Sequence, residues 1–154
     1  MITKSRVVEA LVAQLELSCK RMLEAARKTE EAATDSESRA EGKYDTRGLE
    51  ASYLAAGQAA QVEELTDALR KLRLAPFPDF APNDPVDAGA LVEARVAGEF
   101  CYFLLAPAAG GTVVEIEGSE VTVLAPGAPL RGKMTGLGPG ERLPQPELEV
   151  VAVR

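Results

Sequence analysis

The stretch "VVEALVAQLELSCKRMLEAARKTEEAA" occupies residues 7–33 and repeats apolar or small residues at alternating steps of four and three. This spacing places the repeated side chains on one stripe of an α-helix and is typical of a coiled-coil seam. The expected seam positions are Val8, Val12, Leu15, Cys19, Met22, Ala26, Thr29 and Ala33. The stretch therefore predicts a long helix that packs against a second helix along this stripe.

A second segment repeats the same spacing and supplies the partner helix. Its seam positions are Ala51, Ala55, Gln58, Val62, Leu65, Leu69 and Leu72. Two helices joined by a short turn pack antiparallel, so we expect Val8 opposite Leu72 and Leu15 opposite Leu65. The numbers of facing residues then add to about 80, which puts the turn near residue 40, where Gly42 favours a break. We expect a helical hairpin over residues 1–73 with a charged tip near residues 35–50.

Side-chain size along the expected seam falls toward the tip. Valine and leucine dominate at one end, and alanine dominates at the other. Each lost branch forfeits roughly 1–3 kcal/mol of burial. Small seam residues also let two backbones approach closely, so we expect a narrow tip that is held less tightly than the base.

The composition changes near residue 74. All ten prolines follow Ala75, and the net charge is −1 over residues 1–73 but −6 over residues 74–154. Residues 74–88 hold four of these prolines and predict a stiff, extended linker before a domain at residues 89–154.

The sequence after the linker predicts a domain built mainly from β-strands. Five β-prone runs cover residues 90–98, 99–107, 111–118, 119–126 and 147–154. We expect core side chains at Val113, Ile116, Val121 and Val123, and core or near-core side chains at Phe100, Tyr102 and Phe103. A short helix is expected to start at Pro129, because proline suits the first helical position. The expected fold class is α+β, with a small antiparallel sheet around one short helix.

Composition excludes several classes of function. The chain has no histidine, which rules out histidine-activated nucleophiles and most zinc sites. Cys19 and Cys101 lack metal-ligand spacing and are expected to be small buried hydrophobes. A net charge of −7 is the opposite of what a free-standing DNA-binding module shows.

No membrane segment is expected either. The longest strongly apolar run is ten residues, 100–109, whereas a membrane helix needs about 20. The amphipathic N-terminus does not resemble a signal peptide. We therefore expect a cytoplasmic protein.

The segment "APLRGKMTGLGPGE", residues 128–141, resembles the bacterial Gre transcript-cleavage factors, the GreA/GreB family. That family carries the pattern S-P-L-x-x-x-L-x-G-x-x-x-G-D. Pro129, Leu130, Gly136 and Gly140 coincide with it, and Glu141 replaces its aspartate.

The second helix carries a further, looser match. The family's hairpin tip reads G-D-x-x-E-N-A-E-Y-x-A-A. Residues 49–58, "LEASYLAAGQ", align with it through Ala51, Tyr53, Ala55 and Ala56.

The resemblance implies a coiled-coil hairpin followed by an FKBP-like β domain, acting on bacterial RNA polymerase as a monomer. The β domain would dock on the channel rim through Gly127, Ala128, Pro129 and Leu130. The hairpin would enter the secondary channel, reaching the RNA 3′ end indirectly. Tip carboxylates would then help to hold the Mg²⁺ of the polymerase active site while backtracked RNA is hydrolysed. The chain would have no cofactor of its own and would not itself be an enzyme.

The candidate tip acids are Asp45 and Glu50, which would share the polymerase metal, with Glu41 behind them and Asp35 and Glu37 as further candidates. The family's aspartate and glutamate fall on Thr46 and Leu49 of this chain, so Asp45 and Glu50 are each displaced by one residue. One residue rotates a helical side chain by about 100°.

Three functional readings therefore stay open. The chain stimulates cleavage, or it is a non-cleaving channel regulator that competes with true cleavage factors, or it is a protein–protein adaptor unrelated to transcription. Tyr53 is expected to pack over the small alanines near the tip. Prolyl isomerase activity is not expected, because the chain holds only seven aromatic residues with which to line a pocket.

Overall fold

The computed structural model describes residues 1–39 and 47–154, with side chains at 1–32 and 53–154. It divides the chain into two compact units. We call Leu15–Asp67 the helical unit, and Met1–Gln14 together with Ala68–Arg154 the β unit. The elements follow in the order helix, helix, four strands, short helix and two strands.

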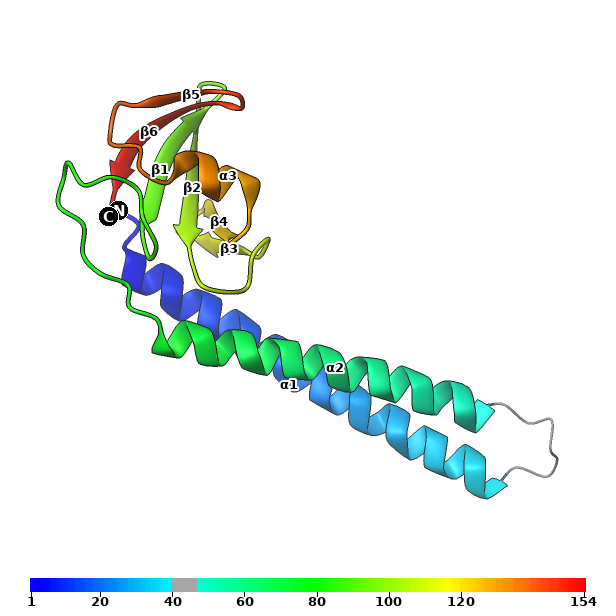
Figure 1. The fold of residues 1–154 in the computed structure, drawn as a ribbon. Helices are drawn as coiled ribbons and strands as arrows, with labels where there is room; N and C mark the ends of the chain where they lie inside the picture. Colours follow the sequence, from blue (N-terminus) through cyan, green and yellow to red (C-terminus); the bar gives the residue numbers. More distant parts are fainter. Residues whose placement is uncertain (40–46) are drawn as a thin grey trace. The chain divides into compact units, whose positions relative to one another are not determined.

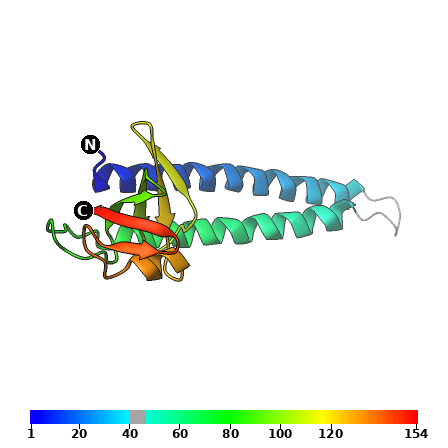
Figure 2. The same ribbon diagram turned by 90° about the horizontal axis from the view of Figure 1, so that it is seen from above.

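The helical unit contains most of two long helices, α1 (Lys4–Arg39) and α2 (Arg47–Leu74). They run side by side in both views (Figures 1 and 2). Cys19 Sγ lies 3.8 Å from Thr66 Oγ1, so the numbers of these facing residues add to 85. The expected pairing near 80 is wrong because α1 continues to Arg39, which moves the midpoint between the helices from residue 40 to about residue 43.

Burial follows the expected seam in the helical unit. Leu15, Ala26 and Ala55 are buried, and Val62 and Leu65 are half-buried. Tyr53 departs from the expectation: its side chain is 71% exposed and does not pack over the alanines.

The first turns of α1 bury a stripe one residue earlier than expected. Val7 and Leu11 are fully buried, whereas Val8 and Val12 are only partly buried. This part of α1 packs on strands: Arg6 pairs with Glu117, and Gln14 Nε2 donates to the carbonyl oxygen of Val113 at 3.3 Å. Contact with a sheet, in addition to a second helix, rotates the buried face.

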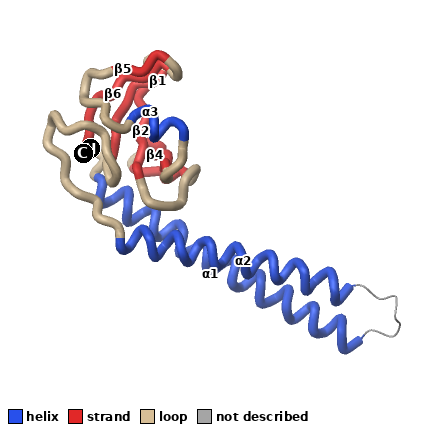
Figure 3. Tube along the Cα trace, viewed as in Figure 1, coloured by secondary structure: helices blue, strands red, loops and turns tan. Residues whose placement is uncertain are grey.

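The β unit holds one six-stranded sheet, shown in red in Figure 3. The strands are β1 (Leu91–Val96), β2 (Glu99–Leu105), β3 (Val113–Ile116), β4 (Ser119–Leu124), β5 (Arg142–Pro144) and β6 (Glu147–Val153). Their order is β3-β4-β2-β1-β6-β5. Four neighbouring pairs are antiparallel as expected, but β2 and β4 are parallel. The fold class is α+β, with a mixed sheet and one strand, β5, that the sequence did not predict.

The short helix α3 (Pro129–Met134) covers one face of the sheet, and the first turns of α1 lie on the other (Figure 2). The α3 face holds a core of buried side chains. Its members are Val86, Ala90, Val92, Ala94, Phe103, Leu105, Leu124, Met134, Leu148, Val150 and Val153.

The opposite face buries Val114, Ile116, Val121 and Val123. Val113 was wrongly expected in this core and is 42% exposed. Strand side chains alternate between faces, so Val114 and Ile116 share the buried face and Val113 does not. Phe103 is buried and Tyr102 half-buried as expected, but Phe100 is 54% exposed, near the turn at the start of β2.

Residues 75–88 carry no helix or strand, yet their C-terminal part packs into the β unit. Val86 is fully buried, donates its N–H to Leu137 and accepts from the N–H of Gly136, both at 2.8 Å. Phe80 packs against the same core. This proline-rich segment therefore contributes to the core as well as connecting the helices to the sheet.

Both cysteines were expected to be small buried residues. Cys19 and Cys101 are free thiols and half-buried, and Cys101 packs against the core.

Within residues 1–39 and 47–154, no helix has the length and apolar character to span a membrane.

Candidate functional site

The expected docking residues lie where α3 begins. Gly127 has a φ of 89°, which favours glycine and turns the chain into the helix. Ala128 is the N-cap but provides no side-chain hydrogen bond, and Pro129 occupies the first turn. The turn closes through the Ala128 N–H, which donates to the carbonyl of Ala125 at 3.1 Å. The sequence thus builds this helix start from backbone geometry instead of a capping hydroxyl.

The four docking residues divide into two exposed and two anchored positions. Gly127 and Pro129 are exposed, whereas Ala128 and Leu130 are half-buried and pack against the core. At the other end of α3, Met134 is fully buried in the same core. The structure therefore brings all four residues together on a short segment that is fixed from below. A small, exposed glycine and proline would let a partner backbone approach closely.

Arg131 holds α3 against the sheet and was not singled out from the sequence. Its guanidinium donates to the carbonyls of Ala106 at 2.5 Å and Leu124 at 2.9 Å. Burial lowers the pKa of Arg131, and the nearby Asp87 carboxylate opposes this shift. The guanidinium stays protonated, because arginine is not deprotonated in proteins. An arginine in a six-residue helix offers no sequence signal for this role, since both acceptors are backbone groups.

The expected tip acids cannot be placed in the same way. Glu41 and Asp45 lie outside the described residues, as do the side chains of Asp35, Glu37 and Glu50. Glu50 belongs to α2 by its backbone. Among the residues that the structure describes, no three acidic or cysteine side chains form a group that could hold a metal ion.

The described part of the seam has a hollow where its residues are small. A cavity of about 570 Å³ opens between α1 and α2, lined by Leu23, Ala26, Val62 and neighbouring acids. The Leu23 side chain is 53% exposed. The small residues that were expected to bring the helices together thus also leave a shallow surface groove.

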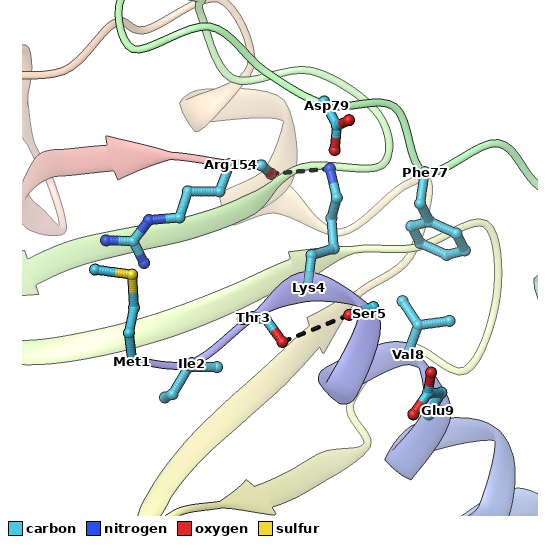
Figure 4. Close-up of a pocket in the computed structure, with 10 residues that line it drawn as sticks. All are labelled: Met1, Ile2, Thr3, Lys4, Ser5, Val8, Glu9, Phe77, Asp79 and Arg154. Atoms are coloured by element: carbon cyan, nitrogen blue, oxygen red, sulfur yellow. Dashed lines mark hydrogen bonds between the residues drawn. The ribbon is translucent and has the colours of Figure 1, made fainter.

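A second cavity of about 470 Å³ lies at the start of α1 (Figure 4). Lys4 extends along it, donates to the carbonyls of Pro78 and, at 3.0 Å, Arg154, and stacks 4.8 Å from the Phe80 ring centre. Burial lowers the pKa of Lys4, and Asp79 partly offsets that effect. The ammonium is occupied by these contacts, so it fastens α1 to residues 78–80 and to the end of the sheet.

No family model matches the chain, and no curated protein matches it significantly. Solved structures do match. The chain resembles Gre-type factors.

The matching structures are GreA factor homolog 1 (Gfh1) proteins. The Thermus thermophilus structure is 21% identical, with 93% of this chain and 94% of that chain covered, and a TM-score of 0.36. A second, described as the transcription factor Gfh1, is 21% identical with 94% of each chain covered and a TM-score of 0.37. The Thermus aquaticus structure is 19% identical with 95% of each chain covered and a TM-score of 0.37.

Proposed function

We propose that this chain is a Gre-type transcription factor that binds bacterial RNA polymerase. In this proposal the β unit docks at the rim of the secondary channel, and the helical unit enters the channel. The chain is an accessory factor and not itself an enzyme. Any hydrolysis takes place at the polymerase active site and uses its Mg²⁺.

The proposal depends mainly on α3. The segment with the most specific sequence resemblance, residues 128–141, begins with a short helix at Pro129 and lies between β4 and β5. Its docking residues are grouped, and Arg131 and Met134 fix the helix from below. A rigid and partly exposed segment of this kind suits recognition, because little order must be gained on binding.

The helical unit supports the proposal by its seam. Buried Ala26 and Ala55 mark the positions where two helices can approach closely. A pair of helices with small packing residues suits entry into a narrow channel. The paired seam also favours a monomer, because it covers the stripe that a dimer would use.

The tip decides between cleavage and competition. Carboxylates suit Mg²⁺, and a second metal can activate water for phosphodiester cleavage. Asp45 and Glu50, with Glu41 behind them, are the residues that would provide the carboxylates. Their displacement from the family positions favours a second candidate function, in which the chain occupies the channel without stimulating cleavage.

A backtracked bacterial elongation complex with Mg²⁺ tests both candidates. RNA cleavage is measured with the wild-type chain and with the double variant Asp45→Ala/Glu50→Ala, each with and without an authentic Gre factor. We expect the wild type to accelerate cleavage and the double variant to lose this acceleration by about a hundredfold or more, because removal of groups that organise a catalytic metal has large effects. Glu63→Ala/Glu64→Ala, which removes two exposed acids of α2 that are not candidate tip acids, serves as a matched control.

Each of the other outcomes changes the assignment. Suppression of the authentic factor without cleavage would establish the competitor function. A chain that neither cleaves nor competes would remove the polymerase function and leave the protein–protein adaptor.

A further inference from the structure

Four side chains form one row across the sheet, on the face opposite α3 and beyond the part that α1 covers. Arg95 of β1 faces Phe100 of β2 on one side and Glu149 of β6 on the other, and Glu149 faces Arg142 of β5. We call Phe100, Arg95, Glu149 and Arg142 the arginine row. Cross-strand partners in antiparallel pairs point to the same face, so all four side chains share one surface.

The two arginines of this row have different partners. Arg142 pairs with Glu149 at 2.9 Å. Arg95 lies over the Phe100 ring, with the guanidinium carbon 4.9 Å from the ring centre. Among the side chains that the structure describes, at residues 1–32 and 53–154, none forms an ion pair or a side-chain hydrogen bond with Arg95. Stacking on an aromatic ring orients a guanidinium while its N–H donors at the edge stay available.

A hollow adjoins these donors. It measures about 220 Å³ and is lined by both arginines, Glu149 and the turn at Ala97 and Gly98. Gly98 has a φ of 89°, and a Cβ built there would meet nothing within 4 Å. The hollow therefore opens beside two cations and has room for one small acidic side chain.

We propose that the hollow beside Arg95 receives a carboxylate side chain from a partner protein. Arg95 would bind the carboxylate through its free N–H fork, Arg142 would add a second positive charge, and exposed Phe100 would provide apolar contact. Arginine and aromatic residues are enriched in protein–protein interfaces and among the residues that dominate their affinity. The identity of the partner as RNA polymerase rests on the proposed function.

The surrounding charge favours a single carboxylate over a nucleic acid. Residues 74–154 carry a net charge of −6. Glu147 and Glu149 line the same hollow, and exposed Glu99 lies next to Phe100. A phosphate backbone would bring many negative charges against these acids, whereas a single carboxylate brings one, which the guanidinium of Arg95 can balance.

Binding to purified bacterial RNA polymerase core enzyme, free of nucleic acid, tests the proposal. We expect Arg95→Gln to raise the dissociation constant about tenfold, because it removes the charged partner of an interface pair. Ala88→Glu is the matched control: it changes the net charge by the same amount at another exposed position of the β unit, and it should change the constant less than twofold. Thermal unfolding of both variants verifies that they are folded.

A second variant identifies the bound group directly. Arg95→Lys keeps the positive charge and places an amine in the hollow. A carbodiimide then joins this amine to a contacting carboxylate without a spacer, and mass spectrometry finds the joined peptides. We expect a polymerase aspartate or glutamate linked to residue 95, and its linkage should remain even if Arg95→Gln proves unstable.

The possible failures are distinguishable. If the wild type binds, Arg95→Gln binds equally well and position 95 gives no cross-link, the hollow is not a docking site, while the proposed function stands. If the wild type does not bind, both proposals fail. If Arg95→Gln weakens binding only to a single-stranded RNA oligonucleotide, the surface belongs to nucleic acid and the carboxylate proposal is overturned.

Discussion

The β unit and the helical unit bury side chains of different size. The β unit buries large residues completely, among them Leu91, Leu104, Leu105, Met134 and Leu148. In the described part of the helical unit, Leu15 is the one large buried side chain, and the other two buried residues are alanines. Since burial of apolar area is the main source of stability, the β unit has the stronger core. In the described part of the helical unit, small buried side chains let the helices approach closely but contribute less burial free energy than large ones.

The largest expected effect comes from a change in the better-packed unit. Met134→Ala removes a fully buried side chain from α3 and leaves a cavity in the core. We expect the free energy of unfolding to fall by about 2–5 kcal/mol. Urea unfolding followed by circular dichroism measures it, with exposed Glu120→Ala in β4 as the control that should stay within about 0.5 kcal/mol. A loss below about 1 kcal/mol for Met134→Ala would mean that the β core is less tightly packed than its burial indicates.

A smaller effect tests the polar attachment of the same helix. Arg131→Met keeps most of the side-chain length but leaves the carbonyls of Ala106 and Leu124 without this donor. We expect a destabilisation of about 1.5–3 kcal/mol, since both bonds come from a charged donor. The matched control is Arg142→Met, whose arginine side chain is 74% exposed and whose ion pair should matter less. If Arg131→Met lost no more unfolding free energy than Arg142→Met, the hydrogen bonds of Arg131 to the two carbonyls would not stabilise the fold more than an exposed ion pair does.

The smallest expected effect has opposite signs in the two units. Gly89 in the β unit has a φ of 82°, and an added Cβ would lie 2.9 Å from Pro78 Cδ and 3.0 Å from the Pro76 carbonyl oxygen. We expect Gly89→Ala to destabilise by about 1–2 kcal/mol. Gly57 lies inside α2 with nothing within 4 Å of an added Cβ, so Gly57→Ala should stabilise by about 1 kcal/mol.

Thermal unfolding of these two glycine variants compares the units directly. A stabilised Gly89→Ala, or a destabilised Gly57→Ala, would contradict the difference in packing. The pair also acts as its own control, because the chemical change is the same at both positions.

The sequence predicted the helices and strands better than it predicted which of their side chains are buried. Helical spacing identified both long helices, and the β-prone runs identified five of the strands. The burial of Val7 and Leu11 could not be predicted from the seam, because it depends on strands more than 80 residues away in the sequence. The parallel pairing of β2 with β4 is equally non-local. Phe100 was expected near the core on hydrophobicity alone, yet its place beside the β1–β2 turn leaves it exposed.

In the candidate site, too, local features could be predicted from the sequence and contacts with distant residues could not. Pro129 predicted the start of α3, because proline's fixed φ is a local property. The anchoring role of Arg131 and the stacking of Arg95 on Phe100 could not be predicted, since each needs a partner that only the folded sheet provides. Asp45 and Glu41 lie outside the described residues, so their prediction remains open.

The strand order also constrains when the β unit can form during synthesis. β1 lies between β2 and β6, and Val92 pairs with Val153 in the last strand. As the chain leaves the ribosome, the helices and the first four strands emerge while one edge of β1 still has no partner. An open edge of this kind can pair with another chain. Completion of β6 closes that edge, so β1 keeps one open edge until residues 147–153 have emerged.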